Sequence, residues 1–293
     1  MNLSTIINKH QHQKKLGTIT SIFIYLCCAF FLLSEFIPPT VTLPHGYANL
    51  NLITSPIDQA LLYDYPSFYE RLENFIKLYG FEALEEQTNL PSSAIDLLEQ
   101  IKKTAFWQGA YPILIKGGLV ALEEAWHSVP VFEKIRSGQY WRLFSPCLLH
   151  GDILHLFFNM TWLFVLGKEM EACLSPWRYI FFILLCGSIS NTAQYLVSGA
   201  NFIGFSGVLC GMLAFIWMRQ RLAPWEGYQM DQRTFMFMFI FVVGLAGVQT
   251  LLFILQSYFN LTFYLNIANM AHISGGITGV ALGRLSFFKW RPV

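Results

Sequence analysis

Ser206 lies in the stretch NFIGFSGVLCG (201–211), where one hydroxyl stands among glycines and apolar residues at the start of an apolar segment. A serine hydroxyl becomes a useful nucleophile when a neighbouring base takes its proton, and histidine is the most frequent base. His272 occurs in a second segment rich in small residues, AHISGGITG (271–279). The two side chains could therefore perform acyl transfer, provided that the fold brings them together.

Small residues predict how the segments that carry Ser206 and His272 meet. In both segments these residues recur every four positions, a spacing that lets two membrane helices approach closely. They are Gly207 and Gly211 in the first segment, and Ala271, Gly275, Gly279 and Gly283 in the second. Packing of these faces would place the hydroxyl and the imidazole at one contact. Small residues that serve packing alone are the competing interpretation, and it leaves His272 without a role.

Further polar residues could stabilise the oxyanion that forms on an attacked carbonyl. His155 and Asn159 are four residues apart and so share one helix face, and His150 precedes them. The side chains of Asn159 and His150 can donate hydrogen bonds, as can the free amides of a helix that begins at Ser206. Asp152 could orient a base as in a triad, but a carboxylate at the start of a helix is favoured as a cap.

A metal site is not expected from these histidines. Two zinc ligands on one helix stand four residues apart with a carboxylate nearby, as in HExxH. His150 and His155 are five residues apart, and the sequence contains no HExxH motif. We therefore expect neither a metal nor another cofactor.

The composition indicates a membrane protein. The chain has 293 residues, 54% hydrophobic and only 13% charged, whereas soluble domains carry about twice that share of charge. The net charge of +1 does not indicate nucleic-acid binding, because the basic residues occur in short runs between apolar segments. Cysteines fall in or beside apolar segments and imply no disulfide framework. They are Cys27, Cys28, Cys147, Cys173, Cys186 and Cys210.

Six apolar segments predict an all-α polytopic protein with six transmembrane helices. They cover residues 17–37, 148–166, 177–198, 204–218, 234–257 and 266–286. The first is too long for a cleaved signal peptide and is expected to remain as an anchor. The fourth is short, so the loop before it should dip into the protein. The expected divisions are 1–37 (N-terminus and first helix), 38–140 (insertion and first outer loop) and 141–293 (catalytic core).

Charge predicts the orientation of these helices. With the N-terminus inside, the inner segments hold 11 Lys and Arg against 4 Asp and Glu, and the outer segments hold 8 against 14. Positive residues favour the cytoplasmic side, so both termini should be cytoplasmic. The second helix then carries His150, His155 and Asn159 near its outer end, the fourth carries Ser206 and the sixth carries His272. Polar groups within a membrane are costly, which favours a functional site at that depth.

The region 38–140 is acidic and is expected to contain helices. Apolar residues have helical spacing in 67–87 and 93–107, and Ser92 or Ser93 could cap the second of these after Pro91. The region could lie on the membrane surface, pack as a small subdomain on the outer loop, cover the active site or bind a partner. The packed and surface-lying interpretations are favoured over regulation.

The motifs together resemble the rhomboid intramembrane serine proteases. GFSG (204–207), HGDILHLFFN (150–159), AHISGGITG (271–279) and Trp141–Arg142 stand in the order and on the helices that this family uses. The resemblance covers about residues 138–284. It implies a long helical extracytoplasmic insertion between the first two helices, because the family's first outer loop is usually shorter.

This resemblance implies a role for each matched residue. Ser206 corresponds to the nucleophile and His272 to the general base of a dyad without an acid. His150 and Asn159, with the amide of Ser206, correspond to the oxyanion hole. The remaining matches support the site or the outer loop. They are His155, Gly204 and Gly207 for the site, and Trp141 and Arg142 for the loop.

Two departures from the family's pattern remove no reacting group. Cys210 stands four residues after the serine, where the family often has a tyrosine whose ring packs against the base. Gly167 and Glu171 resemble a GxxxExxxG motif whose last glycine is replaced by Ser175. Loss of the tyrosine ring could loosen His272 without abolishing the dyad.

The expected function is hydrolysis of peptide bonds in or near transmembrane helices of substrate proteins, within the bilayer of a bacterial inner membrane. The active site should open to the extracytoplasmic side. Two alternatives remain. A catalytically inactive relative could bind transmembrane helices as a chaperone or trafficking factor. A transporter or channel should show inverted repeats and polar residues through the whole span, and neither is evident in the sequence.

Overall fold

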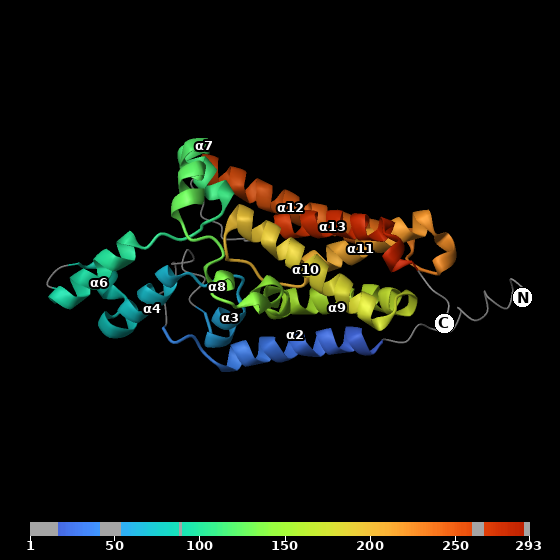
Figure 1. The fold of residues 1–293 in the computed structure, drawn as a ribbon, viewed down its shortest axis with the longest axis horizontal. Coiled ribbons are helices and arrows are strands. Elements are labelled where there is room, and N and C mark those ends of the chain that lie inside the picture. The colour runs from blue at the N-terminus through green and yellow to red at the C-terminus, as the bar shows by residue number, and fades with distance from the viewer. Residues whose placement is uncertain (1–16, 42–53, 88–89, 260–266, 290–293) are drawn as a thin grey trace, which may run out of the picture.

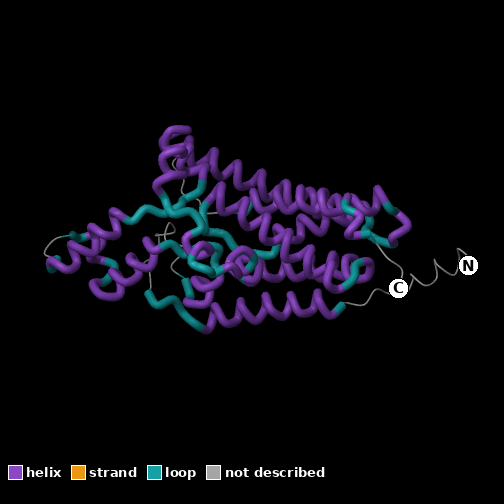
Figure 2. Tube along the Cα trace, viewed as in Figure 1, coloured by secondary structure: helices purple, strands orange, loops and turns teal. Residues whose placement is uncertain are grey.

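Helices form the whole of the regular structure in the part of the chain described by the computed structural model, residues 17–41, 54–87, 90–259 and 267–289. Six long helices run roughly along one axis (Figures 1 and 2). They are α2 (Thr18–Phe36), α9 (Ile153–Cys173), α10 (Pro176–Ser198), α11 (Ser206–Leu222), α12 (Gln232–Phe259) and α13 (Asn269–Arg284). The largest buried apolar cluster joins α2, α9, α10 and α11.

The second long helix differs from its expected bounds of 148–166, since α9 begins at Ile153 and ends at Cys173. Its start is set by Asp152, whose carboxylate accepts a hydrogen bond from the amide of His155 at 2.8 Å. His150 therefore lies in the loop before the helix. Residue 266, where the sixth span was expected to begin, lies outside the described residues, and α13 begins at Asn269.

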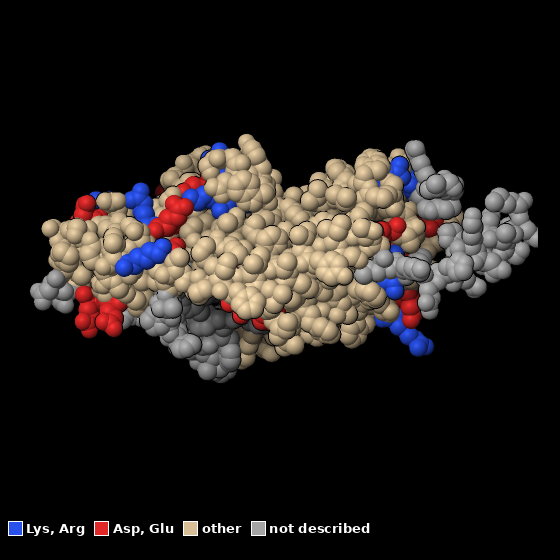
Figure 3. All heavy atoms as spheres, turned by 90° about the horizontal axis from the view of Figure 1, so that it is seen from below, with Lys and Arg blue, Asp and Glu red and all other residues tan. Residues whose placement is uncertain are grey.

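Three described helices are long and apolar enough to cross a membrane: α2, α10 and residues Gln232–Leu252 of α12. The helices α11 and α13 have 17 and 16 residues, and α9 is interrupted by charged residues near its end. Six crossings therefore remain a prediction. Figure 3 shows charged side chains gathered toward the two ends of the molecule, with a broad uncharged band between them. The orientation also remains a prediction, and four of its basic residues lie outside the described part: Lys9, Lys14, Lys15 and Arg291.

Glycines bring α11 and α13 together backbone to backbone. A Cβ atom added at Gly275 would overlap the carbonyl oxygen of Gly207, and one added at Gly279 would overlap that of Gly211. A Cβ at Gly283 would lie 2.9 Å from the Cβ of Met218. The four-residue spacing of small residues thus marks the surfaces on which these two helices pack.

The far end of the bundle is tied by Glu171 of α9. Its carboxylate accepts hydrogen bonds from the amides of Ile19 and Thr20, both at 2.9 Å, and from the Thr20 hydroxyl at 2.7 Å. These amides belong to the first turn of α2, which has no intrahelical acceptors for them. A Cβ at Gly167 would overlap the Thr20 side chain. Gly167 and Glu171 of the altered GxxxExxxG motif therefore fasten α2 to α9.

Residues 54–139 form a smaller helical region at the end of the bundle where α10 ends. Its helices are α3 (Pro56–Leu61), α4 (Ser67–Tyr79), α5 (Glu82–Glu85), α6 (Ser92–Lys103), α7 (Ala110–Ser128) and α8 (Glu133–Arg136). The helix expected over 67–87 is broken at Gly80, which has a φ of 82°. The expected serine cap is wrong: Pro91 occupies the N-cap position, and Ser92 is the first helical residue.

A buried carboxylate joins this region to α10. Asp64 accepts hydrogen bonds from the amides of Glu133 (3.1 Å) and Lys134 (3.0 Å) and from the Tyr195 hydroxyl (2.9 Å). Burial raises the pKa of Asp64, and these donated hydrogen bonds oppose the rise. The indole of Trp107 also donates to the Tyr195 carbonyl at 3.1 Å. The smaller region is thereby packed on the end of α10.

Candidate active site

Ser206 and His272 lie at hydrogen-bond distance. The Nε2 atom of His272 is 2.8 Å from the Oγ atom of Ser206. Ser206 is the first residue of α11, and His272 lies in the first turn of α13 with 8% of its surface exposed. The glycine contact between the two helices continues directly below this pair, so the backbones that carry the two side chains have little freedom to separate.

The loop before Ser206 is held at Gly204. Its amide donates to the Pro146 carbonyl at 2.9 Å, and its φ of 119° is one that other residues rarely adopt. A Cβ at this position would come within 2.7 Å of the His155 ring. Gly204 thus lets the chain turn tightly against α9 immediately before the serine, and His155 forms the wall on which it rests.

Polar residues of α10 lie against the starts of both site helices. The side-chain oxygen of Gln194 accepts a hydrogen bond from the Ala271 amide at 3.1 Å, next to His272. A Cβ at Gly207 would lie 2.8 Å from the Ser190 hydroxyl. Both α10 residues are buried. Neither residue belongs to a motif of the sequence, and their polar side chains within an apolar segment are the one signal that could have marked them.

Hydrogen-bond donors remain unused near the serine. The amides of Val208 and Leu209 donate to the Phe205 carbonyl, while those of Ser206 and Gly207 have no acceptor among the described residues. Such free amides at a helix start are favourable partners for a developing negative charge.

The side chains expected to assist are buried next to the same loop. Both ring nitrogens of His150 and the Oδ1 atom of Asn159 are buried and have no partner among the described residues. The Asn159 amide nitrogen donates to the His155 carbonyl at 2.9 Å. The rings of His150 and His155 pack edge to face with centroids 5.1 Å apart. This arrangement leaves His150 with capacity to donate to an added oxygen atom.

No acidic side chain completes a catalytic triad with Ser206 and His272 in the described part of the chain. The Nδ1 atom of His272 is buried and lacks a hydrogen-bond partner there. Asp152, the candidate for a triad, instead caps α9. Within the same residues, no group of three His, Cys, Asp or Glu side chains is arranged to hold a metal ion. Cys210 lies one turn beyond Ser206 on α11 and is half-buried.

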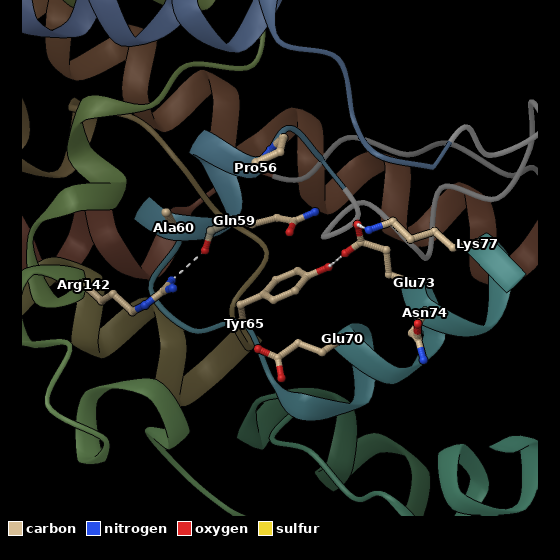
Figure 4. A pocket seen from close by; sticks show the side chains of 9 residues that line it. All are labelled: Pro56, Gln59, Ala60, Tyr65, Glu70, Glu73, Asn74, Lys77 and Arg142. Carbon is tan, nitrogen blue, oxygen red and sulfur yellow. Dashed lines mark hydrogen bonds and ion pairs between the residues drawn. The ribbon is translucent and has the colours of Figure 1, made fainter.

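Trp141 and Arg142 lie in the segment before α9 and contact the smaller helical region. Arg142 is buried and donates to the carbonyls of Gln59 (2.8 Å) and Leu62 (2.6 Å), and the Trp141 indole donates to the Ala60 carbonyl at 3.1 Å. Figure 4 shows Arg142 beside a polar cavity. The charged groups there pair with neighbours, as Glu73 does with Lys77 at 3.4 Å. The two residues therefore act as structural anchors for α3.

Comparisons with known proteins agree with the motifs. A family model described as the rhomboid domain matches residues 137–288, slightly more than half of the chain. Proteins named Rhomboid protease GlpG from Yersinia pestis (strain Pestoides F) and Yersinia pseudotuberculosis serotype O:3 (strain YPIII) are 31% identical over 170 residues, which are 58% of this chain and 55% of theirs. The Rhomboid protease GlpG of Pectobacterium atrosepticum is 33% identical over 144 residues, 49% of this chain and 48% of its own.

The chain spans about half the length of the curated relatives that it matches. The matched part contains Ser206, His272 and the polar residues around them, whereas the family match begins after α8. Together with the apolar helices, these matches identify an integral membrane protein.

Proposed function

This chain belongs to the rhomboid family, and from that premise we propose that it is an intramembrane serine endopeptidase. It would hydrolyse peptide bonds in or near the transmembrane helices of other proteins. The observation that carries this proposal is the 2.8 Å approach of the Ser206 hydroxyl and the His272 imidazole across the contact between α11 and α13. A nucleophile and a base within hydrogen-bond reach are what acyl transfer requires.

The proposed reaction proceeds in two halves. The Ser206 oxygen attacks the scissile carbonyl carbon while Nε2 of His272 takes the hydroxyl proton. The imidazolium then gives this proton to the leaving nitrogen, the C–N bond breaks, and the acyl group stays on Ser206. In the second half a water molecule attacks the ester, His272 takes the water proton and returns it to the serine oxygen, and the new carboxyl end departs.

The negative charge that forms on the carbonyl oxygen is proposed to be held by donors at the start of α11 and beside it. These are the amide of Ser206, the side chain of His150, and the second N–H of the Asn159 side chain, whose first N–H donates to the His155 carbonyl. Their support is the free amides at the start of α11 and the buried, unpartnered ring nitrogens of His150. Donors that are fixed before the reaction cost no reorganisation when charge develops.

The proposed substrates are membrane proteins whose helix unwinds locally before attack, because helical carbonyls are already hydrogen-bonded. Resemblance to the family favours small residues at the cut, with glycine or proline nearby. We also propose a bacterial inner membrane, cytoplasmic termini, a water-accessible site on the extracytoplasmic side, and a catalytic core over 141–293 preceded by the 38–140 insertion.

A fluorophosphonate probe, which reacts with activated serines, tests the proposal. We expect the wild-type protein to be labelled, and Ser206→Ala and His272→Ala to lose labelling and cleavage of single-span substrates by at least ~10³-fold. Ser274→Ala is the matched control, because the Ser274 hydroxyl donates only within α13, to the carbonyls of Met270 and Ala271. Asn159→Ala should reduce the rate by about 10²–10³.

The same measurement distinguishes a protease from a catalytically inactive relative. A folded wild-type protein that resists the probe but still retains single-span proteins in detergent would indicate an inactive relative that binds helices. Labelling that persists in Ser206→Ala would place the nucleophile elsewhere and end the proposal.

A further inference from the structure

A groove runs between α6 and α7 in the smaller helical region, with a volume of about 700 Å³. We call it the α7 groove. Apolar side chains form most of its walls, among them Phe106, Ile113, Ala121 and Val129. Two lysines, Lys102 and Lys116, also line it. The groove lies outside the matched family domain and takes no part in the proposed reaction.

The charge of the α7 groove is opposite to that of its surroundings. Residues 38–140 contain 12 Asp and Glu against 7 Lys and Arg, yet no acidic side chain lines the groove. Neither Lys102 nor Lys116 forms an ion pair with a described residue, whereas the neighbouring Lys103 pairs with Glu99 at 3.2 Å. The groove therefore offers an apolar bed with two unpaired cations, which is complementary to an amphipathic anion.

The tip of α7 is apolar and exposed. Residues 115–120 are all exposed, with 59% exposure at Ile115, 76% at Leu119 and 69% at Val120. Gly118 breaks the helix there with φ 69° and ψ −163°, a conformation essentially restricted to glycine. Trp126 is also exposed, at 52%. An exposed apolar tip with a nearby aromatic side chain and a lysine is typical of a segment that enters a membrane interface.

Contacts with α10 place the α7 groove at the level where an apolar helix ends. A Cβ at Gly109 would overlap the Val197 carbonyl, and one at Gly199 would come within 2.8 Å of the Gln108 carbonyl. The helix α10 is one of the candidate membrane spans and ends at Ser198. Figure 1 shows α7 at this end of the bundle. The start of α7 is thus packed on the end of α10, at the level where this candidate span ends.

We propose that the α7 groove binds one anionic phospholipid from the leaflet at this end of the bundle. An acyl chain lies against Phe106, Ile113 and Val129, and Lys102 and Lys116 hold the phosphate, while the exposed tip enters the same leaflet. A peptide is less well matched, because the walls are helices whose backbone donors are already used and offer no strand edge. This assignment depends on membrane insertion and not on protease activity.

Native mass spectrometry of the full chain in detergent, with phosphatidylglycerol or phosphatidylcholine added at equal concentration, tests the assignment. We expect one phosphatidylglycerol to be retained in preference to phosphatidylcholine. Each of Lys102→Gln and Lys116→Gln should weaken retention about 5-fold, as expected for a lysine near an anionic headgroup. Lys103→Gln is the matched control and should retain lipid as the wild type does.

A second variant tests the apolar bed without changing charge. Ala121→Trp should fill the groove and reduce retention of phosphatidylglycerol at least 10-fold, with helix content by circular dichroism unchanged. Equal retention of the two lipids, or wild-type retention by the Lys102→Gln/Lys116→Gln double variant, would overturn the assignment. So would saturable binding of a soluble acidic helical peptide that depends on the two lysines and displaces no lipid.

Discussion

The helices α13 and α12 both carry glycines, but they use them differently. On α13, Gly275 and Gly279 allow backbone contact with α11, and added Cβ atoms there would overlap carbonyl oxygens. On α12, an added Cβ at Gly244 or Gly247 would meet no heavy atom of another described segment within 4 Å. In the apolar stretch of α12 only 6% of the residues are buried, whereas 44% are buried in that of α10. Tight packing is therefore concentrated where a 2.8 Å contact between two side chains has to be maintained.

The contacts of α12 with α9 are made by aromatic rings, and the Gln249 side chain of α12 accepts a hydrogen bond from that of Asn269 at the start of α13. Phe237 lies 5.9 Å from Trp162 of α9, and Phe241 lies 5.8 Å from Phe158, measured between ring centroids. Ring pairs of this kind tolerate small shifts and contribute about 0.5–1.5 kcal/mol each beyond their buried area. The comparison predicts that substitutions on α13 disturb both stability and the Ser206–His272 pair, while those on α12 disturb stability alone.

Gly275→Ala should have the largest effect. The added methyl overlaps the Gly207 carbonyl oxygen, so α11 and α13 must separate. We expect a loss of about 2–3 kcal/mol in stability and a fall of about 100-fold in fluorophosphonate labelling, because displacements near 1 Å cost that much in a reacting pair. Thermal unfolding in detergent and labelling kinetics measure the two effects.

Its control is Gly276→Ala on the same helix, where an added Cβ meets nothing within 4 Å. Equal behaviour of the two variants would mean that the backbone contact does not position the pair.

Gln194→Ala should have the next largest effect. It removes the acceptor for the Ala271 amide at the start of α13, and an unpaired buried amide costs about 1–3 kcal/mol. We expect labelling to slow about 10-fold, and Gln194→Glu to recover most of the rate because it keeps an acceptor oxygen. Fluorophosphonate labelling of both variants, quenched at a series of times, gives the ratio of their labelling rates. No difference between them would show that the acceptor is dispensable.

Phe237→Ala should have a smaller effect, confined to stability. The ring pair with Trp162 is lost, for about 0.5–1.5 kcal/mol, but no described contact links Phe237 to Ser206 or His272. The melting temperature should fall by a few degrees while the labelling rate of the folded protein stays within 2-fold. A labelling loss as large as that of Gly275→Ala would contradict the division between the two helices.

Gly244→Ala should have the smallest effect. It makes the same chemical change as Gly275→Ala, but on α12, where the added methyl has open space. Helix propensity alone then applies, and alanine is favoured over glycine by up to about 1 kcal/mol. We expect an unchanged or slightly raised melting temperature and wild-type labelling. A destabilisation comparable to that of Gly275→Ala would remove the basis of the comparison.

The sequence predicted the parts of this molecule that depend on local spacing. Small residues every four positions placed α11 against α13, and the apolar segments agree with five of the six long helices within a few residues. The predicted start of the second span, at residue 148, is wrong by five residues, because α9 begins at Ile153. Leu149 and His150 carry no formal charge that would end a span in the sequence, but the helix starts after the cap at Asp152. Hydropathy does not register such a cap.

Contacts of residues outside the motifs were not predictable. The hydrogen bond from the Ala271 amide to Gln194 joins residues 77 apart in the chain, and Gln194 belongs to no recognisable motif. Asp64 and Tyr195 are separated by 131 residues. The expected helix over 67–87 failed at Gly80 because a single residue with positive φ ends a helix whose apolar spacing continues beyond it.

The loop between α10 and α11 is fastened at both ends, at Gly199 against Gln108 and at Gly204 against Pro146. One fastening belongs to the smaller helical region and the other to the segment before α9. A displacement of the smaller region is consequently transmitted through this loop to Ser206, the first residue of α11. An antibody fragment that binds α6 would shift this loop and thereby the position of Ser206, without binding at the active site.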